Sequence, residues 1–282
     1  MANQPNIESV GCPAPSVSFE ESDPLPKTLP ELHHHIPNTT RLKENIYRWV
    51  NFHEQNGDEA IKVISFISIR SKYLTFSKDF IPKLKDHILS RLLNHAYDGD
   101  EVEYSEEGRD SVQFVGNRLY RHKTLRVNYT TYDLRRQQDS VNPHTHPDIM
   151  LLSHEDPSDE VNTHPYWYAR IVGIFHVEIV HHGPRSISSN KRRIDFVWVR
   201  WFGRDVSLKA GLAAKRLHRV GFLDAGGPAA FGFLDPAIVI RGVHMIPAFA
   251  HDQTAELLSP PRSVARLPLE EESDWSFYYV NM

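Results

Sequence analysis

Apolar residues recur at helical spacing in two segments after residue 40. The first stripe, with intervals of four, three and one residues, consists of Leu42, Ile46, Trp49 and Val50. It predicts an amphipathic helix that begins near Thr40 and ends near Asn56-Gly57. The second stripe follows Pro82, which a first helical turn tolerates, and consists of Leu84, Ile88, Leu92, Leu93 and Ala96. Residues 63–77 show neither period, so strand and helix both stay open there.

Closely spaced β-type segments follow Gly108. They are residues 111–115, 119–121, 125–129, 149–152, 166–180, 194–202 and 238–245. Gly116-Asn117 is typical of a hairpin turn between the first two, and a short helix is expected at 208–217. Strands this close together favour an antiparallel barrel or sandwich. We expect segments 166–180 and 194–202 to pair as antiparallel neighbours. The residues that this pairing should bury are Ile171, Ile174, Val197 and Val199.

Proline separates a first region from the rest of the chain. Residues 1–40 contain seven of the 19 prolines, and residues 41–142 contain one. Because proline fixes φ and has no backbone donor, this density predicts a disordered arm over 1–38. A short partner-binding motif within the arm is the alternative, and His33, His34 and His35 are expected to be solvated. The predicted organisation is this arm, a helical region at 39–110 and a β-domain at 111–282, which together make an α+β fold.

Composition narrows the classes of function. The 282 residues are 40% hydrophobic and carry a formal net charge of −4, which excludes a wholly disordered chain and gives no sign of a charge-driven polyanion binder. Cys12 is the single cysteine, so no internal disulfide can form, and an intracellular location is expected. No apolar run reaches the roughly 20 residues of a membrane helix, so no membrane partner is expected.

One segment opposes the overall charge. Residues 185–222 contain ten Lys and Arg and two Asp, a local balance of +8. Such a surplus is typical of a surface that contacts phosphates. The candidates for nucleic-acid contact are Lys191, Arg192, Arg193, Lys215, Arg216 and Arg219. The alternatives are solubility alone, or internal pairing with the acidic run at 98–110, which holds seven acids and one base.

His144-Thr145-His146-Pro147-Asp148 is the pattern closest to a metal site. Alternate residues of an extended segment place His144, His146 and Asp148 on one side, and imidazoles with a carboxylate suit zinc. A zinc-dependent hydrolase is the function that this pattern would support. In metallo-β-lactamase-like hydrolases another His follows directly, whereas Ile149 follows here. The candidates for a third histidine ligand are His154, His164 and His176. We therefore expect no metal, with less than about 0.2 equivalents of zinc in the purified protein.

The sequence lacks other catalytic patterns. Cys12 lies in the proline-rich arm, and no Gly-x-Ser-x-Gly elbow is present. Gly226-Gly227-Pro228 lacks the Lys-Ser/Thr of a phosphate loop. We expect a protein that is not an enzyme and that binds no nucleotide or other cofactor.

Two strand sequences are rich in aromatic residues. They are Tyr166-Trp167-Tyr168-Ala169-Arg170-Ile171 and Phe196-Val197-Trp198-Val199-Arg200-Trp201-Phe202-Gly203-Arg204. Both resemble the signature strands of the bromo-adjacent homology domain, a small SH3-like β-barrel with insertions. The chain departs from that family at Gly203-Arg204-Asp205, where the family has an aromatic residue and then Arg-Pro. The resemblance implies such a barrel here. It also suggests a cage for methylated lysine, with core packing as the alternative for most of its rings, which are Tyr166, Tyr168, Trp198 and Trp201.

Six further runs are distinctive. They are Lys83–His87, Ala96–Asp100, Leu125–Asp133, His164–Arg170, Ala229–Pro236 and Met245–His251. Together they resemble the C-terminal region of fungal Plavaka-type transposase-related proteins, cousins of the CACTA-type DNA transposons. In that family the acidic catalytic core lies upstream, and nothing here matches it. The resemblance implies a non-catalytic accessory module that contacts a chromatin protein or DNA in the nucleus. A degenerate fragment without activity is the alternative, because residues 63–77 look inserted and the chain looks truncated at Met282 relative to the family.

Overall fold

The computed structural model describes most of the chain after residue 32. The described residues are 33–36, 42–56, 58, 60–61, 80–97, 99, 102–130, 136–153, 164–183, 190–211, 214–258, 263–266 and 273–281. All of them belong to one structural unit, Leu32–Met282. Residues 63–77, whose secondary structure the sequence left open, lie outside this set, as does most of the predicted arm.

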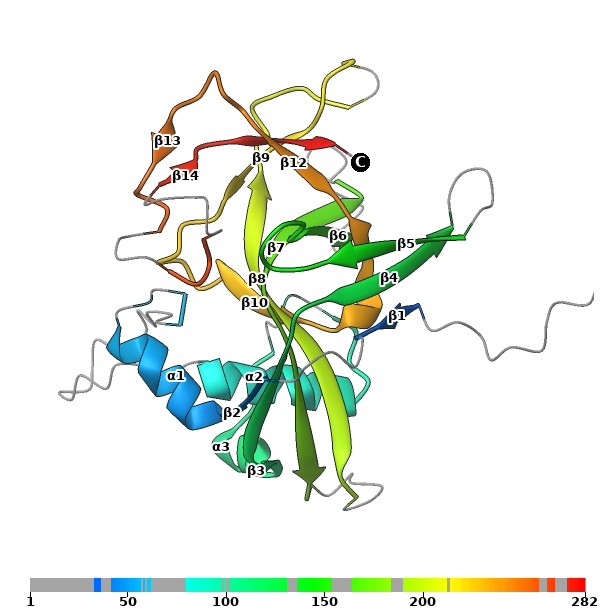
Figure 1. Ribbon diagram of the computed structural model, residues 1–282, viewed down its shortest axis with the longest axis vertical. Coiled ribbons are helices and arrows are strands. Elements are labelled where there is room, and N and C mark those ends of the chain that lie inside the picture. The colour runs from blue at the N-terminus through cyan, green and yellow to red at the C-terminus, as the bar shows by residue number, and fades with distance from the viewer. Residues whose placement is uncertain are drawn as a thin grey trace, which may run out of the picture. The chain divides into compact units, whose positions relative to one another are not determined.

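Two long antiparallel strands form the centre of the main sheet. β7 (Tyr166–His181) and β8 (Arg192–Arg204) pair along most of their length (Figure 1). The four residues expected to be buried by this pairing are each at most 1% exposed: Ile171, Ile174, Val197 and Val199. Both the predicted pairing and the predicted burial are confirmed.

The other described strands extend this pair or form small sheets beside it. They are β1 (His34–His35), β2 (Leu42–Asn45), β3 (Val112–His122), β4 (Leu125–Thr130), β5 (Arg136–Val141), β6 (Asp148–Leu152), β9 (Arg219–Phe222), β10 (Phe231–Leu234), β11 (Val239–Gly242), β12 (His244–Pro247), β13 (Gln253–Thr254), β14 (Asp274–Trp275) and β15 (Tyr278–Asn281). The main path runs β11-β6-β7-β8-β9-β15-β12, while β3 also pairs with β7, β2 with β3 and β10 with β8. Smaller sheets have the orders β1-β4-β5 and β13-β14.

The two ends of the main strand path are neighbours in the chain. β11 and β12 are the first and last strands of the path, yet only Val243 separates them. The N–H of Val243 donates to the carbonyl oxygen of Asp148 in β6. Among the described residues the sheet is not closed by a continuous ladder of strand pairs. The fold is α+β and consists mostly of antiparallel sheet, as predicted at that level.

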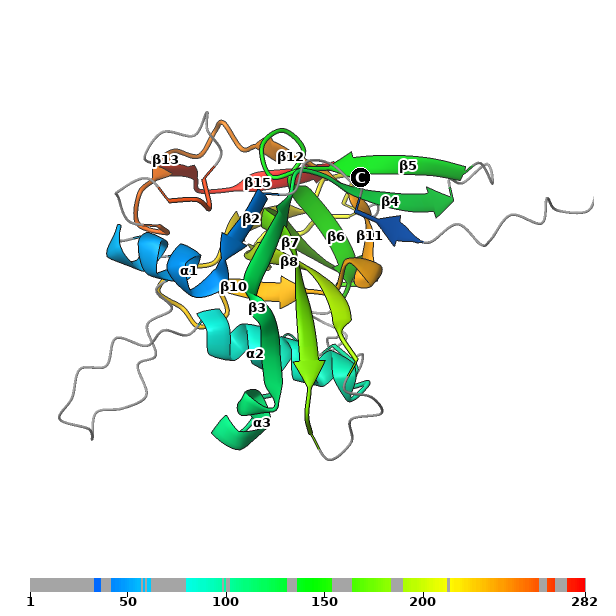
Figure 2. The same ribbon diagram turned by 60° about the horizontal axis from the view of Figure 1, so that its bottom comes forward.

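Two helices pack against the sheet and share its core. α1 (Ile46–Gln55) and α2 (Phe80–Leu92) lie beside β3 and β8, with the short α3 (Glu106–Asp110) next to α2 (Figure 2). Trp49 of α1 and Phe80 of α2 both contact Trp198 of β8 edge to face, with ring centroids 6.0 and 5.4 Å apart. The helices expected at 39–110 therefore belong to the same core as the β-rich part. No described helix is long and apolar enough to cross a membrane.

The first helix is shorter than predicted. The side chain of Asn45 accepts the backbone N–H of Arg48 and caps the helix, so α1 begins at Ile46. Leu42, expected on the apolar stripe, instead lies in β2, pairs with Arg121 of β3 and is 58% exposed. For Leu42, strand pairing with β3 therefore prevails over the helical conformation that its spacing from Ile46 predicts.

The predicted hairpin at Gly116-Asn117 is wrong. β3 continues through this pair without reversing. Gly116 and Asn117 have positive φ values of 62° and 51°, and the register with β7 shifts between Phe114 and Leu119. The preference of these two residues for left-handed backbone is used here for a β-bulge rather than a turn.

The helix expected at 208–217 is also wrong for the residues that are described. Turns occupy 206–208 and 214–215, and Gly211 bridges to Arg216. Gly211 and Lys215 have positive φ values of 93° and 52°, which a right-handed helix cannot contain.

The end of the predicted disordered arm is ordered. His34 and His35 form β1, which pairs with Val127 and Arg126 of β4. His33 Nε2 lies 2.7 Å from the carbonyl oxygen of Val239. The prediction of disorder over 1–38 is therefore wrong for residues 33–36, and His34 and His35 are partly buried rather than solvated, whereas His33 is exposed.

Candidate functional site

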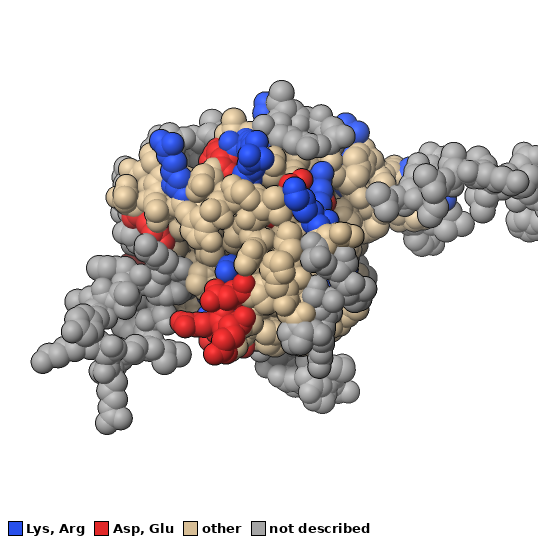
Figure 3. All heavy atoms as spheres, turned by 90° about the horizontal axis from the view of Figure 1, so that it is seen from below, with Lys and Arg blue, Asp and Glu red and all other residues tan. Residues whose placement is uncertain are grey.

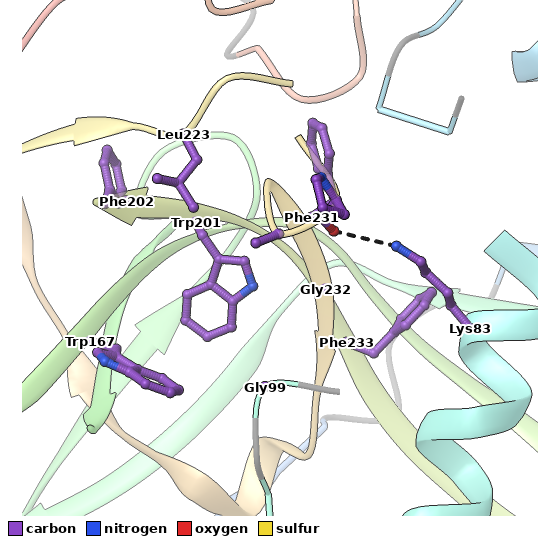
Figure 4. Close-up of a pocket in the computed structure, with 11 residues that line it drawn as sticks. Lys83, Gly99, Trp167, Trp201, Phe202, Leu223, Phe231, Gly232 and Phe233 are labelled. Atoms are coloured by element: carbon purple, nitrogen blue, oxygen red, sulfur yellow. Dashed lines mark hydrogen bonds between the residues drawn. The ribbon is translucent and has the colours of Figure 1, made fainter. Parts of the chain in front are cut away.

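An aromatic pocket of about 280 Å³ lies between α2, the end of β8 and the turn that leads into β10 (Figure 4). Its lining includes Lys83, Trp167, Trp201, Leu223, Phe231 and Phe233. These side chains come from segments far apart in the sequence, so only the folded sheet brings them together. Figure 4 shows the Trp201 indole between Trp167 on one side and the β10 residues on the other.

Two tryptophans on neighbouring strands form one wall of the pocket. The rings of Trp167 in β7 and Trp201 in β8 meet edge to face, with centroids 5.9 Å apart and planes at 81°. Both side chains are partly exposed. Both also pack against the buried cluster that contains Ile171 and Val199, so the sheet supports the wall from beneath.

A close backbone approach fixes the position of Trp201. A Cβ atom added at Gly232 would lie 2.8 Å from Trp201 Nε1, closer than real side chains approach one another. The backbone N–H of Trp201 donates to the carbonyl oxygen of Ala230 over 2.9 Å, and the carbonyl oxygen of Trp201 accepts the N–H of Leu223 over 3.1 Å. Because the backbone of Trp201 is anchored on both sides, the pocket is formed before any ligand arrives.

The chemistry of the pocket is apolar with one cation at its edge. Lys83 of α2 is the charged residue among the described lining side chains, and its Nζ donates to the carbonyl oxygen of Pro228 over 3.4 Å. None of those described lining residues carries a carboxylate. Binding pockets of this kind are usually apolar and aromatic with few polar groups. The lining thus suits a neutral apolar or aromatic group better than a methylated ammonium.

The four rings proposed as a methyl-lysine cage do not meet in one place. Trp198 is 2% exposed and belongs to the cluster under the helices. Tyr168 is 3% exposed in a different cluster, against which Tyr166 packs. Burial, with the neighbouring Tyr166, raises the pKa of Tyr168 to about 12. Only Trp201 of the four lines the aromatic pocket, where its partner is Trp167. Alternation along β7 separates residues 167 and 168 onto opposite faces, and this is the signal that could have identified Trp167.

The six basic candidates form two separate groups. Lys191, Arg192 and Arg193 are exposed at the start of β8, whereas Lys215, Arg216 and Arg219 lie in or after the loop that follows its other end. β8 has 13 residues, and at about 3.3 Å per residue its ends lie up to about 40 Å apart. Figure 3 shows Lys and Arg in separate groups on the face seen from below, with one cluster of acidic side chains apart from them and further acidic side chains beside the basic ones. The structure does not bring the six residues into one patch.

Two of these arginines have acidic partners close by in the sequence. Arg193 Nη2 lies 2.7 Å from Asp195 Oδ1, and Arg219 Nη2 lies 2.5 Å from Asp205 Oδ2. In the described part of the acidic run, Asp110 lies 3.8 Å from Lys85, and Arg109 pairs with Asp86. These contacts differ from the predicted pairing of the two regions.

The His144-His146-Asp148 pattern does not form a metal site. His144 and His146 lie in an exposed turn, while Asp148 is buried and accepts Arg170 Nε over 2.8 Å. His146 and Asp148 do line one polar pocket of about 560 Å³, together with Asp139 and His244. The guanidinium of Arg170 already neutralises the carboxylate of Asp148 that a metal would need.

A different group of possible metal ligands is assembled on the sheet. Among the described residues, one set of three side chains could hold a metal ion: His122, His176 and Asp195. His176 was a candidate third ligand for the 144–148 pattern, but it lies with other partners. Spacing in the sequence could not reveal this group, because its members come from three different strands.

No protein-family model, no curated protein and no solved structure matches this chain, so the geometry described above is the basis for its function.

Proposed function

We propose that this chain is a non-catalytic interaction module of a transposase-derived protein, and that its aromatic pocket binds an apolar side chain of a protein partner. The observation that carries the proposal is the preformed wall of Trp167 and Trp201 beside Gly232. Partly exposed tryptophans in a rigid pocket are typical of binding hot spots. The transposase context rests on the six sequence runs described above.

An SH3-like barrel of the bromo-adjacent homology type belongs to the same proposal. Its support is the position of Val243, which joins the first and last strands of the sheet path. Strands along that path contribute side chains to one cluster, which includes Tyr168, Phe202, Phe222 and Tyr278. A single bent strand spanning β11 and β12 would then complete a small barrel around these rings.

A protein partner fits the pocket better than nucleic acid does. Nucleic-acid surfaces combine aromatic residues with a continuous basic track. Here Lys83 is the one cation among the described residues that line the pocket, and the six basic candidates form two groups toward opposite ends of β8. A chromatin protein is the partner class that the family resemblance supports, together with a nuclear location. Contact with DNA is the second role that the resemblance allows.

The two rival functions have weaker support. A zinc hydrolase at His144, His146 and Asp148 would need the Asp148 carboxylate as a ligand, but this carboxylate already forms an ion pair with Arg170. A degenerate fragment without activity would have no reason to keep a preformed pocket. Such a fragment would bind no partner, and the binding experiment below tests this.

The proposal is tested by selecting ligands from a random peptide library displayed on phage. We expect selected peptides to share an apolar or aromatic anchor residue and to bind in the micromolar range. Trp201→Ala should weaken that binding at least about tenfold, a loss of about 1.4 kcal/mol. The matched control is Phe249→Ala, because Phe249 is 73% exposed and is not among the residues that line the pocket.

Thermal unfolding of both variants checks that they are folded, because Trp201 also packs against the core. Peptides that bind the Trp201→Ala protein as tightly as the wild type would contradict the site. A failure to select any peptide would favour the degenerate fragment.

A further inference from the structure

Three adjacent strands bring two histidines and an aspartate to one face of the sheet. In the register of β7 and β8, His176 lies opposite Asp195. On the other side of β7, Tyr120 lies opposite His176 and His122 lies opposite Ile174. Since alternate residues of a strand share a face, His122 lies diagonally across from His176 on the same face. This face continues into the buried cluster that contains Ile174 and Val197.

The three side chains converge closely. One ring nitrogen of His122, one of His176 and a carboxylate oxygen of Asp195 all lie within 4.8 Å of one another. His122 Nε2 and His176 Nδ1 are 2.6 Å apart. The two histidines are 2% and 1% exposed, whereas the Asp195 side chain is 28% exposed. Two buried imidazoles thus meet a carboxylate that solvent can reach.

Neighbouring residues hold these groups in place. The ring of Tyr120 stacks on His176, with centroids 4.4 Å apart and planes at 2°. Arg193 contacts Asp195 through Oδ1 alone, with its Nε at 2.9 Å and its Nη2 at 2.7 Å. Oδ2 is then the oxygen that could turn toward an ion. Supported ligands on rigid strands are what a metal site requires.

We propose that His122, His176 and Asp195 bind a divalent transition-metal ion such as Zn²⁺. Two imidazole nitrogens and one carboxylate oxygen are a ligand set that zinc uses, and three protein ligands leave one position for water or an external group. Ligand atoms of a tetrahedral zinc ion lie roughly 3.3 Å apart, at about 2.0–2.1 Å from the metal. Binding therefore moves the two histidine nitrogens apart by roughly a further 0.7 Å. The proton on the nitrogen that donates between them moves to the other nitrogen of the same ring, so that both histidines coordinate as neutral imidazoles.

This site is independent of the aromatic pocket, since His122, His176 and Asp195 do not line it. It also removes the reason for expecting a zinc-free protein. That expectation assumed that no three ligands converge. Here three ligands do converge, and they come from β3, β7 and β8 rather than from residues 144–148.

The test titrates Co²⁺ and then Zn²⁺ into chelator-treated protein without an affinity tag. We expect about one equivalent of Co²⁺ to bind with the visible absorption of a four-coordinate ion, and Zn²⁺ to displace it. The melting temperature should rise when the metal is present. Lowering the pH should weaken binding, because the ligands must be neutral imidazoles.

Variants separate this site from other histidines. Asp195 is the partly exposed ligand, so Asp195→Asn should leave the protein folded and weaken metal binding at least about tenfold. His176→Asn should abolish metal binding. The control is His146→Asn, in the exposed turn, which should bind like the wild type. If His176→Asn does not fold, Asp195→Asn decides alone.

Two results would overturn the proposal. One is the absence of binding by folded wild-type protein at about 100 µM metal, an affinity that corresponds to only about 5 kcal/mol; the histidines would then form a hydrogen-bonded pair only. The other is binding that Asp195→Asn leaves unchanged.

Discussion

Arg200 on β8 and Asp274 on β14 form an ion pair in which neither side chain has any solvent exposure. The guanidinium donates to both carboxylate oxygens, over 3.1 and 2.9 Å. It also lies 3.9 Å from the centroid of the Phe222 ring. This pair ties the central strand of the sheet to a segment more than seventy residues further along the chain.

Removing the acid of this pair should destabilise the protein strongly. In Asp274→Asn the charge of Arg200 stays buried without a counter-charge, and breaking a buried pair in this way costs about 3–5 kcal/mol. The matched control is Asp110→Asn, because Asp110 is 84% exposed beside Lys85 and a surface pair contributes at most about 1 kcal/mol. Urea unfolding of both variants measures the difference. Equal losses would contradict the structural role of the Arg200–Asp274 pair.

The stability of the protein should fall as the solution becomes acidic, in part because of His218. Burial lowers the pKa of His218, and the nearby His164 and Arg204 lower it further. The rings of His164 and His218 have centroids 4.3 Å apart. The folded pKa lies below the unfolded value of about 6.5, so the unfolded chain binds more protons at acidic pH. The free energy of unfolding is therefore unaffected by His218 above about pH 6.5 and falls as the pH drops below that value.

Replacing His218 should therefore flatten the dependence of stability on pH. We expect His218→Gln to unfold with a smaller slope of free energy against pH between about pH 5 and 6.5 than the wild type. Urea titrations at several pH values measure this slope. A variant with the wild-type slope would show that burial at residue 218 has no effect on protonation.

DNA binding should be weak and independent of sequence. One basic group at the start of β8 offers Lys191, Arg192 and Arg193, and such non-specific complexes have dissociation constants of about 10⁻⁴–10⁻⁶ M. With roughly three phosphate contacts, log K should fall against log salt with a slope of about −2.7. Changing the three residues to Glu should flatten the slope. The control is Lys215→Glu with Arg216→Glu, beyond the other end of β8, which should leave the salt dependence due to residues 191–193 in place. No binding to a random duplex at about 50 mM salt would exclude the nucleic-acid role.

Patterns that depend on neighbouring residues could be predicted from the sequence. The apolar density of residues 166–180 and 194–202, with turn residues between them, identified β7 and β8, and their pairing brings Ile171 opposite Val199. The second helix was also expected, although it begins at Phe80, two residues before Pro82. The two strands are long and densely apolar, and the helix has a clear apolar stripe, which is why the local sequence is sufficient to find them.

Features that depend on contacts between distant segments could not be predicted. Gly116-Asn117 carries the same left-handed preference in a hairpin and in a bulge, and only the continuous partner strand β7 decides between them. Likewise, the partnership of Trp167 with Trp201 and the convergence of His122 with His176 depend on strand register. The aromatic run at 166–168 identified the right region, but not which ring faces the pocket.

The central claim is that the space beside Trp201 is a binding site, and one alanine substitution tests it most directly. A methyl group at residue 232 must displace the indole of Trp201, since the added Cβ would lie 2.8 Å from its Nε1. Overpacking of this kind costs about 1–3 kcal/mol of stability, which the protein should survive. The matched control is Gly226→Ala, where the added Cβ would lie 3.5 Å from Asp224 Oδ1, an ordinary contact.

The decisive measurement is calorimetric titration of a selected anchor peptide into folded Gly232→Ala and Gly226→Ala proteins. We predict that Gly232→Ala weakens binding at least about tenfold and that Gly226→Ala binds like the wild type. Equal affinities for the two variants would contradict the claim that the aromatic pocket is where this protein meets its partner.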